Sequence, residues 1–197
     1  MGAFKPLLPF GEKSVVECCV AGLRGAGVAE IVVVVGHRAD DVRARLAHAP
    51  VRFALNAEAA SEMGASIARG VEGLSKQTRA VLVALADHPA VTPDAIKFVI
   101  DAHEQTGARF VVPTWQGRGG HPVLIDLAYR EELLRLDEGR GLRGLLEAHA
   151  AEVSRTEVGC SYVARDMDTW EDYRALYEEV FGVPPPTRNP QSDHTSS

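Results

Sequence analysis

The sequence has few cysteines, no long apolar run and no excess of basic residues. Its 197 residues include only three cysteines, two of them adjacent at Cys18 and Cys19, so no disulfide framework is indicated and a reducing compartment is the simpler setting. The longest apolar run, 80–86, is much shorter than the ~20 residues of a membrane-spanning helix. The chain does not open with a basic region followed by an apolar stretch. These absences predict a cytoplasmic protein with no membrane partner.

Charge of one sign is not concentrated either. Lys and Arg total 21 against 27 Asp and Glu, a net charge of −6, and the basic residues form no stripe that could neutralise a phosphate backbone. We therefore expect no nucleic-acid partner. Hydrophobic residues make up 46% and charged residues 24% of the chain, which is typical of a folded globular domain.

Apolar runs and helical patterns alternate along the chain, which predicts an α/β fold with a largely parallel sheet. Helices are expected at 14–26, around Val42 and Leu46, at 65–74, from Thr92-Pro93 onward, and at 129–136, 142–150 and 170–181. Strands are expected at 31–35, 51–55, 80–86, 109–113, 122–126 and 153–158. The first strand is continuously apolar and is expected to be buried on both faces.

The end of the chain differs in composition. From Pro184 it is rich in proline and polar residues and has no apolar periodicity. We therefore expect one domain at 1–183 and a disordered tail at 184–197.

Several common site motifs are missing. The phosphate-loop pattern Gly-x-x-x-x-Gly-Lys-Ser/Thr is absent, as are HExxH and a paired CxxC. The segment 139–144 matches Gly-x-Gly-x-x-Gly, but it follows an amphipathic helix rather than a strand, which argues against a dinucleotide site.

Acidic residues at two places could hold a metal ion. Asp87 follows the apolar strand 80–86, and ligands of open α/β sheets bind at the carboxyl ends of strands. Asp166 and Asp168 are spaced to point the same way in an extended segment. Such carboxylates suit Mg²⁺. Asp87 could instead cap a helix or turn ahead of Pro89, and Asp168 or Thr169 could cap a helix that begins at Trp170, so the sequence alone leaves both interpretations open.

Two further residues are candidates. His121, between Gly120 and Pro122, could face a ligand or simply be solvated. Lys5 lies in a stiff apolar setting and by itself would be interpreted as a surface lysine.

Seven motifs in order carry a resemblance to a known family. They are Met1-Gly-Ala-Phe-Lys5-Pro-Leu-Leu-Pro-Phe-Gly11, Val32-Val-Val-Val-Gly36, Asn56 with Gly64-Ala-Ser66, Leu85-Ala-Asp87-His-Pro89, Gly119-Gly-His-Pro122, Gly141-Leu-Arg143-Gly-Leu-Leu and Asp166-Met-Asp-Thr169-Trp-Glu-Asp172. The succession resembles the MobA-like nucleotidyltransferases, with the molybdenum cofactor cytidylyltransferases as the most similar branch.

The resemblance implies a Rossmann-like nucleotidyltransferase fold, a mostly parallel sheet flanked by helices. It implies transfer of a nucleoside monophosphate, CMP from CTP by preference, to a phosphate-bearing acceptor such as molybdopterin, with Mg²⁺ and release of pyrophosphate. The roles that it implies are triphosphate binding for Lys5, metal binding for Asp87, Asp166 and Asp168, nucleotide contacts for Asn56, Gly64 and Ser66, and an acceptor pocket bordered by His121 and Arg143. A molybdoenzyme or its chaperone is the candidate protein partner.

The sequence departs from the family at its start. The family begins with a strand and the loop Leu-Ala-Ala-Gly-x-Ser-x-Arg-Met-Gly, and this chain starts at the final Met-Gly. We therefore expect a shortened form of a protein that begins upstream, in which apolar side chains of 32–35 or 81–85 are poorly covered. His88 also stands where relatives often carry glutamine, which leaves the base preference open.

Two alternatives remain. One is a nucleotidyltransferase for a sugar-phosphate or polyol-phosphate acceptor. The other is a catalytically silent binding module that lacks the phosphate loop.

Overall fold

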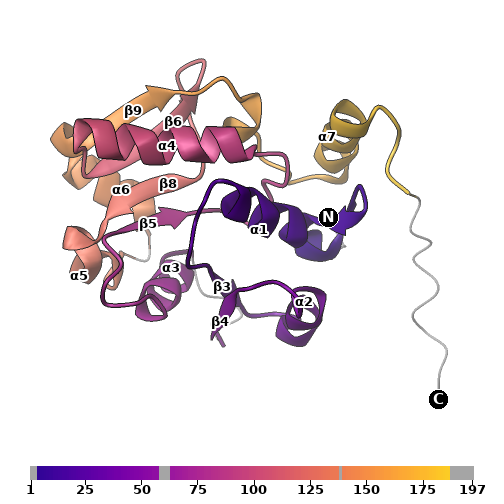
Figure 1. Cartoon of the computed structure of the whole chain (residues 1–197), viewed down its shortest axis with the longest axis horizontal. Helices are drawn as coiled ribbons and strands as arrows, with labels where there is room; N and C mark the ends of the chain where they lie inside the picture. The colour runs from indigo at the N-terminus through magenta and orange to yellow at the C-terminus, as the bar shows by residue number, and fades with distance from the viewer. Residues whose placement is uncertain (1–3, 58–62, 138, 187–197) are drawn as a thin grey trace.

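The computed structural model describes residues 4–57, 63–137 and 139–186, and the strands among them form three sheets (Figure 1). β1 (Pro9–Phe10) and β2 (Lys13–Ser14) form an antiparallel hairpin, and β3 (Val32–Val35) pairs in parallel with β4 (Arg52–Leu55). The third sheet has the order β5-β8-β6-β7, with β9 also paired to β6. Its strands are β5 (Ala80–Val83), β6 (Phe110–Trp115), β7 (Arg118–Gly119), β8 (Val123–Asp126) and β9 (Val153–Glu157).

The helices flank these sheets. The α-helices are α1 (Val15–Gly25), α2 (Ala39–Arg45), α3 (Met63–Glu72), α4 (Pro93–Thr106), α5 (Arg130–Leu133), α6 (Gly141–Ala148) and α7 (Trp170–Phe181). Short 3-10 helices are η1 (Lys5–Leu7), η2 (Leu127–Tyr129), η3 (Ala150–Glu152) and η4 (Ser161–Ala164). The α/β fold predicted from the sequence is confirmed.

Local capping chemistry sets where the helices begin. Ser14 precedes α1, and both its backbone N–H and its hydroxyl donate to Glu17 Oε2, at 2.7 and 2.6 Å. Thr92 precedes α4 and its Oγ1 accepts a hydrogen bond from the backbone N–H of Ala95 at 3.3 Å. These bonds satisfy N–H groups that a helix N-terminus otherwise leaves unpaired. Both helices start where the sequence predicts.

The sheet is mixed, which corrects the expectation of a mostly parallel one. β8 lies between β5 and β6 and is antiparallel to both. Only the segment 116–122 connects β6 to β8, and it contains β7 but no helix. Parallel neighbours need a crossover of a dozen or more residues, so this short connection can only return the chain in the opposite direction.

Helices cover both faces of the five-stranded sheet. Along β6, Phe110 and Val112 face a core shared with α3, α5 and α6, whereas Val111 packs with Val99 of α4 on the other side. This alternation is the two-residue period of a strand. The sheet therefore acts as a rigid platform whose strand ends can hold a site.

The β3–β4 sheet is not joined to the five-stranded sheet by any strand that the structure describes. Val32, Val33 and Val34 of β3 and all four residues of β5 are only half-buried. The expectation that the strand at 31–35 is buried on both faces is therefore wrong. The sequence also predicts poor coverage of apolar side chains at 32–35 or 81–85. This prediction is confirmed for Val32–Val34 and for residues 81–83.

Packing of α7 against the N-terminal hairpin joins the two ends of the domain. Leu8 and Phe10 share a buried cluster with Met167, Tyr173 and other residues of the α7 region. The Tyr173 hydroxyl donates to the carbonyl oxygen of Pro9 at 2.7 Å. This packing brings the segment before α7 close to η1, and both lie on the same side of the view (Figure 1).

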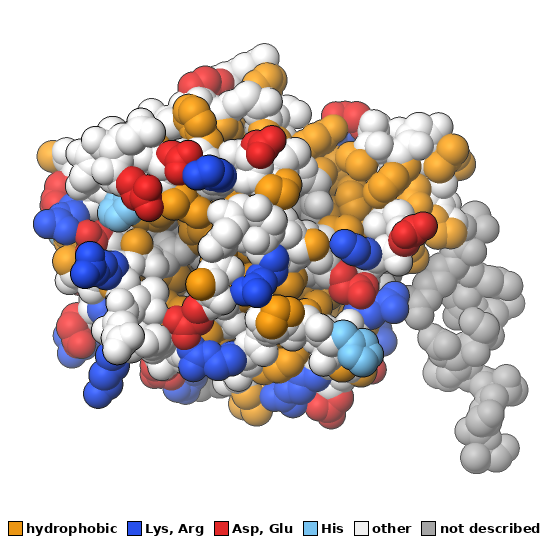
Figure 2. Space-filling view, viewed as in Figure 1, with side chains coloured by type: hydrophobic (Ala, Val, Ile, Leu, Met, Phe, Trp, Pro, Cys, Tyr) orange, Lys and Arg blue, Asp and Glu red, His pale blue; other side chains and the backbone are white. Residues whose placement is uncertain are grey.

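The surface is mixed in charge, and most of the predicted tail lies outside the described residues. On the face in Figure 2, Lys and Arg side chains are interspersed with Asp and Glu, and hydrophobic side chains gather near α7. No helix in the described ranges has the length and apolar character that crossing a bilayer requires. Of the tail predicted at 184–197, residues 187–197 lie outside the described part of the chain.

Candidate active site

Asp87 lies beyond the carboxyl end of β5, but not directly after it. β5 ends at Val83, three residues earlier than the sequence predicts, and residues 84–86 lead to a turn that contains Asp87. The Asp87 side chain is 27% exposed, so its carboxylate is partly desolvated yet reachable.

Lys5 and Asp168 meet Asp87 at this position. The Lys5 ammonium nitrogen lies 2.8 Å from Asp168 Oδ1 and 3.9 Å from Asp87 Oδ2. The carboxylates come from the end of β5 and from the segment before α7, and Lys5 is 163 positions away from Asp168. Three of the four residues to which the resemblance assigns phosphate and metal binding therefore form one cluster, and their roles remain predictions.

His88 is a member of this region whose contacts sequence reasoning missed. Its side chain is only 4% exposed, and Nε2 lies 3.6 Å from Asp166 Oδ1 and 3.8 Å from Asp87 Oδ1. Neither ring nitrogen makes a hydrogen bond within the described residues. The imidazole therefore lies between the carboxylates of Asp87 and Asp166 without a hydrogen bond to either. The sequence marks it only as the residue that follows Asp87 and as a departure from the family pattern.

His121 packs against His88. The two rings are 5.9 Å apart in an edge-to-face arrangement, and His121 Nδ1 lies 3.2 Å from the carbonyl oxygen of Val83. Because a carbonyl only accepts hydrogen bonds, Nδ1 carries the proton in this contact. Its backbone N–H donates to the carbonyl of Val163 at 2.8 Å, and its peptide bond to Pro122 is cis.

Burial lowers the pKa of His121 below its ordinary value near 6.5, and the contact with the Val83 carbonyl opposes this only in part. The unfolded chain thus binds this proton more readily than the folded one. His121 contributes stability that is present above pH 6.5 and is lost as the pH falls through the folded pKa.

We expect acidification from about pH 7.5 to about pH 5.5 to lower the melting temperature less in His121→Gln than in the unsubstituted protein. The exposed His48 serves as the matched control, so His48→Gln should keep the original pH dependence. Calorimetric melting across this pH range makes the comparison. If the melting temperatures of all three proteins depend equally on pH, burial does not lower the pKa of His121 in the folded protein.

Asn56, Ser66 and Gly64 form a separate corner between β4 and α3. Asn56 is buried, and its side-chain amide donates to the Ser66 hydroxyl at 3.0 Å. A Cβ on Gly64 would lie 3.3 Å from Leu136 Cβ, so close packing against Leu136 explains why glycine suits this position. The contacts described for this corner do not reach Lys5 or Asp87.

Arg143 is not brought to the cluster. It lies on α6, on the opposite side of the view from the N-terminus (Figure 1). Its side chain is 87% exposed, and Nε pairs with Glu147 Oε1 at 2.8 Å, one turn further along the helix. Its predicted place at the acceptor pocket has no contact to support it.

Comparison with known families decides the identity of the domain. The family described as "MobA-like NTP transferase domain" matches residues 1–153. The chain belongs to the MobA-like NTP transferase family. Residues 1–153 are thus a nucleotidyltransferase domain, as the resemblance predicted, while the particular branch within the family is not decided by this match.

The curated proteins that this chain resembles carry different names. The bifunctional protein GlmU of Geobacter metallireducens is 35% identical over 111 residues, which are 56% of this chain and 23% of that protein. The chain therefore spans about a quarter of that relative's length. Nicotine blue oxidoreductase of Paenarthrobacter nicotinovorans is 28% identical over 181 residues and 87% of each chain.

Solved structures share the fold. Rv0371c of Mycobacterium tuberculosis H37Rv is 27% identical with a TM-score of 0.79, over 90% of both chains. A complex of the same protein with manganese is 27% identical with a TM-score of 0.76, over 88% of this chain and 91% of that one. A nucleotidyl transferase of Methanothermobacter, 24% identical with a TM-score of 0.78 over 90% of this chain and 85% of that one, supports the fold alone.

Proposed function

We propose that this chain is a Mg²⁺-dependent nucleotidyltransferase that moves CMP from CTP to a phosphate-bearing acceptor of the molybdopterin type. In the reaction an acceptor phosphate oxygen attacks the α-phosphorus of the nucleotide, the bond to the β-phosphate oxygen breaks, and pyrophosphate leaves. The observation that carries the proposal is the cluster of Lys5, Asp87 and Asp168 at the carboxyl end of β5.

The carboxylates at this cluster fit a divalent cation. Asp87 and Asp168 already converge on the positive charge of Lys5, and Asp166 lies beside His88 in the same region. The described residues contain no group of three or more His, Cys, Asp or Glu side chains arranged for a metal ion. Mg²⁺ does not require one, because it commonly binds through one or two carboxylates and keeps its water and phosphate ligands.

Asp87, with Asp168 or Asp166, would hold Mg²⁺, which when bound offsets negative charge on the phosphate oxygens. The Lys5 side chain is 27% exposed, so its ammonium can pair with a phosphate oxygen of an incoming triphosphate. Fixed charges of this kind act mainly by orienting the reactants and stabilising the charge that develops in the transition state.

No side-chain nucleophile is needed for this chemistry. The nearby Cys19 fits that view, because burial raises the pKa of its thiol to about 12 and keeps it protonated. Asn56, Gly64 and Ser66 are proposed to contact the nucleotide, and His121 the acceptor.

Pyrophosphate release from CTP, GTP, ATP and UTP tests the proposal, with molybdopterin or a polyol phosphate as acceptor. We expect release with CTP and molybdopterin to exceed release with each other pair at least ~tenfold, which corresponds to ~1.4 kcal/mol in the barrier. Faster release with the polyol phosphate would favour the alternative acceptor. Nucleotide binding with no release from any pair would favour a silent binding module.

A further inference from the structure

His88 is a deeply buried polar side chain beside the cluster of Lys5, Asp87 and Asp168. Its side chain is 4% exposed, and neither ring nitrogen has a hydrogen-bond partner among the described residues. A neutral imidazole carries one N–H donor and one acceptor nitrogen, and a buried polar group that stays unpaired is costly. Native proteins pair such groups with protein atoms or with bound water. Each nitrogen of His88 therefore requires a partner within reach.

Nε2 of His88 faces two carboxylates at slightly more than hydrogen-bond distance. It lies 3.6 Å from Asp166 Oδ1 and 3.8 Å from Asp87 Oδ1. Ionised carboxylates only accept hydrogen bonds, so Nε2 can bind them only when it carries a proton. A movement of about 0.5 Å brings Nε2–H and Asp166 into the ordinary range of such bonds. Asp166 is 65% exposed, and no hydrogen bond or further ion pair of the described residues holds it, so His88 is the group placed to fix its carboxylate.

A small cavity beside His88 can supply the partner of its other nitrogen, Nδ1. The cavity measures about 20 Å³ and is lined by His88, His121, Cys19 and apolar side chains that include Leu23 of α1 and Ile96 of α4. One buried water needs roughly 10–15 Å³ of such space and two to four polar partners. The cavity thus has room for a single water and two imidazoles to bind it.

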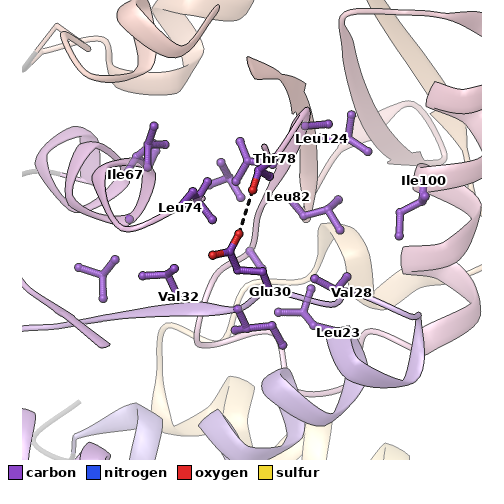
Figure 3. A pocket seen from close by; sticks show the side chains of 18 of the residues that line it. Leu23, Val28, Glu30, Val32, Ile67, Leu74, Thr78, Leu82, Ile100 and Leu124 are labelled. Carbon is purple, nitrogen blue, oxygen red and sulfur yellow. Dashed lines mark hydrogen bonds between the residues drawn. The ribbon is translucent and has the colours of Figure 1, made fainter. Parts of the chain in front are cut away.

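A larger cavity in the domain does not provide this partner. It measures about 970 Å³, lies between β3 and β5, and is surrounded mainly by apolar side chains such as Leu82 and Ile100 (Figure 3). Its acidic residue Glu30 accepts a hydrogen bond from Thr78 at 2.9 Å, and both residues precede the strands. His88 follows β5 at the other end and does not line this cavity. The polar demand of His88 is therefore met in the small cavity.

His121 is suited to bind a water in the small cavity. Its Nδ1–H contacts the carbonyl oxygen of Val83 at 3.2 Å, and its backbone N–H donates to the carbonyl of Val163 at 2.8 Å, so the residue is held from two sides. Burial lowers the pKa of His121, so the ring is uncharged at neutral pH. Nε2 therefore keeps a lone pair that accepts a hydrogen bond from water.

We propose that His88 is a positioning residue: a water bound between His88 and His121 donates to His88 Nδ1, and the proton on Nε2 holds the carboxylates of Asp166 and Asp87 in place for a metal ion. The inference rests on the metal-binding role proposed for Asp87. Because Nδ1 accepts from the water, the single proton of the neutral ring lies on Nε2 and points at the carboxylates. Loss of an outer partner of this kind typically weakens metal binding about 10–100-fold.

Nitrogen NMR of the protein without added metal tests where the protons lie. At about pH 8, where an ordinary imidazole is neutral, we expect the shifts of His88 to show a protonated Nε2 and an unprotonated Nδ1. The exposed His48 should show the averaged shifts of a solvated ring. An unprotonated Nε2 in His88 overturns the proposal. Protons on both nitrogens also overturn it, because Nδ1 could then accept nothing from the water.

Binding of Mn²⁺ to variants tests the positioning role. His88→Leu removes both ring nitrogens and should weaken Mn²⁺ binding at least ~tenfold. His88→Gln keeps an N–H donor at a similar reach and should retain most of the original affinity. His48→Leu, at an exposed position, is the matched control and should leave the affinity unchanged. If His88→Leu does not fold, His88→Asn takes its place, because its amide is too short to reach the carboxylates.

The outcomes separate this inference from the proposed function. Weaker Mn²⁺ binding in Asp87→Asn but not in His88→Leu would overturn the positioning role and leave the metal site intact. Unchanged Mn²⁺ binding in both variants would contradict the metal site and this inference with it. Equal losses in His88→Leu and His88→Gln would show that the packing of the ring matters rather than its N–H, which also overturns the proposal.

Discussion

Asp87→Asn is expected to lower pyrophosphate release at least ~100-fold, equivalent to ~2.7 kcal/mol of lost transition-state stabilisation. The substitution keeps the size of the side chain and removes the charge that faces Lys5 at 3.9 Å. Initial rates with CTP and Mg²⁺ measure the loss, and titration with Mn²⁺ reports metal binding separately. Binding of Mn²⁺ should weaken together with turnover.

Asp94→Asn is the matched control for Asp87. Asp94 is exposed in the first turn of α4, and no ion pair or hydrogen bond of the described residues joins it to the cluster, so its substitution should leave both readouts unchanged. Circular dichroism should be the same for both variants and the original protein. If Asp87→Asn retains near-normal turnover and Mn²⁺ binding, Asp87 does not hold the metal.

Gly120→Ala is expected to destabilise the protein by at least ~3 kcal/mol, at or above the upper end of ordinary overpacking. A Cβ at this position would lie 2.0 Å from the carbonyl oxygen of Val163 and 2.4 Å from its carbonyl carbon. These are backbone atoms of η4, so no side-chain rotation relieves the clash. For a domain of this size the loss corresponds to a fall in melting temperature of at least ~6 °C.

Gly159, which shortly precedes η4, provides the control. A Cβ there would meet nothing within 4 Å, and its φ is not positive. Gly159→Ala should therefore melt within about 2 °C of the original protein. A similar melting temperature for Gly120→Ala and Gly159→Ala would show that the close approach of Gly120 to η4 is not maintained in solution.

Local chemistry explains which elements could be predicted from the sequence. The start of α1 follows from the hydrogen bonds of Ser14 to the Glu17 carboxylate, and the start of α4 from the bond that Thr92 Oγ1 accepts from the Ala95 N–H. Both contacts span three residues. α7 matches its predicted bounds because Thr169 accepts from the N–H of Asp172 and Gly182 supplies the left-handed residue that ends the helix.

Contacts between distant parts of the chain explain which features could not be predicted from the sequence. The direction of β8 depends on the segment 116–122, which is too short for the crossover that two parallel strands require. The burial of His88 between Asp87 and Asp166 depends on how the segment before α7 returns to β5, and no local pattern encodes that path. The resemblance gives Lys5 and Asp168 separate roles, and their contact at 2.8 Å follows from neither the resemblance nor their spacing along the chain.

Transfer of a radiolabel from CTP is the most direct test of nucleotidyl transfer. In this account the acceptor attacks the α-phosphorus, so label at the α position should appear on the acceptor and label at the γ position in pyrophosphate, in equal amounts. Label from the γ position on the acceptor would indicate phosphoryl transfer instead. That result, or no transfer of either label to any phosphate-bearing acceptor, would contradict the assignment.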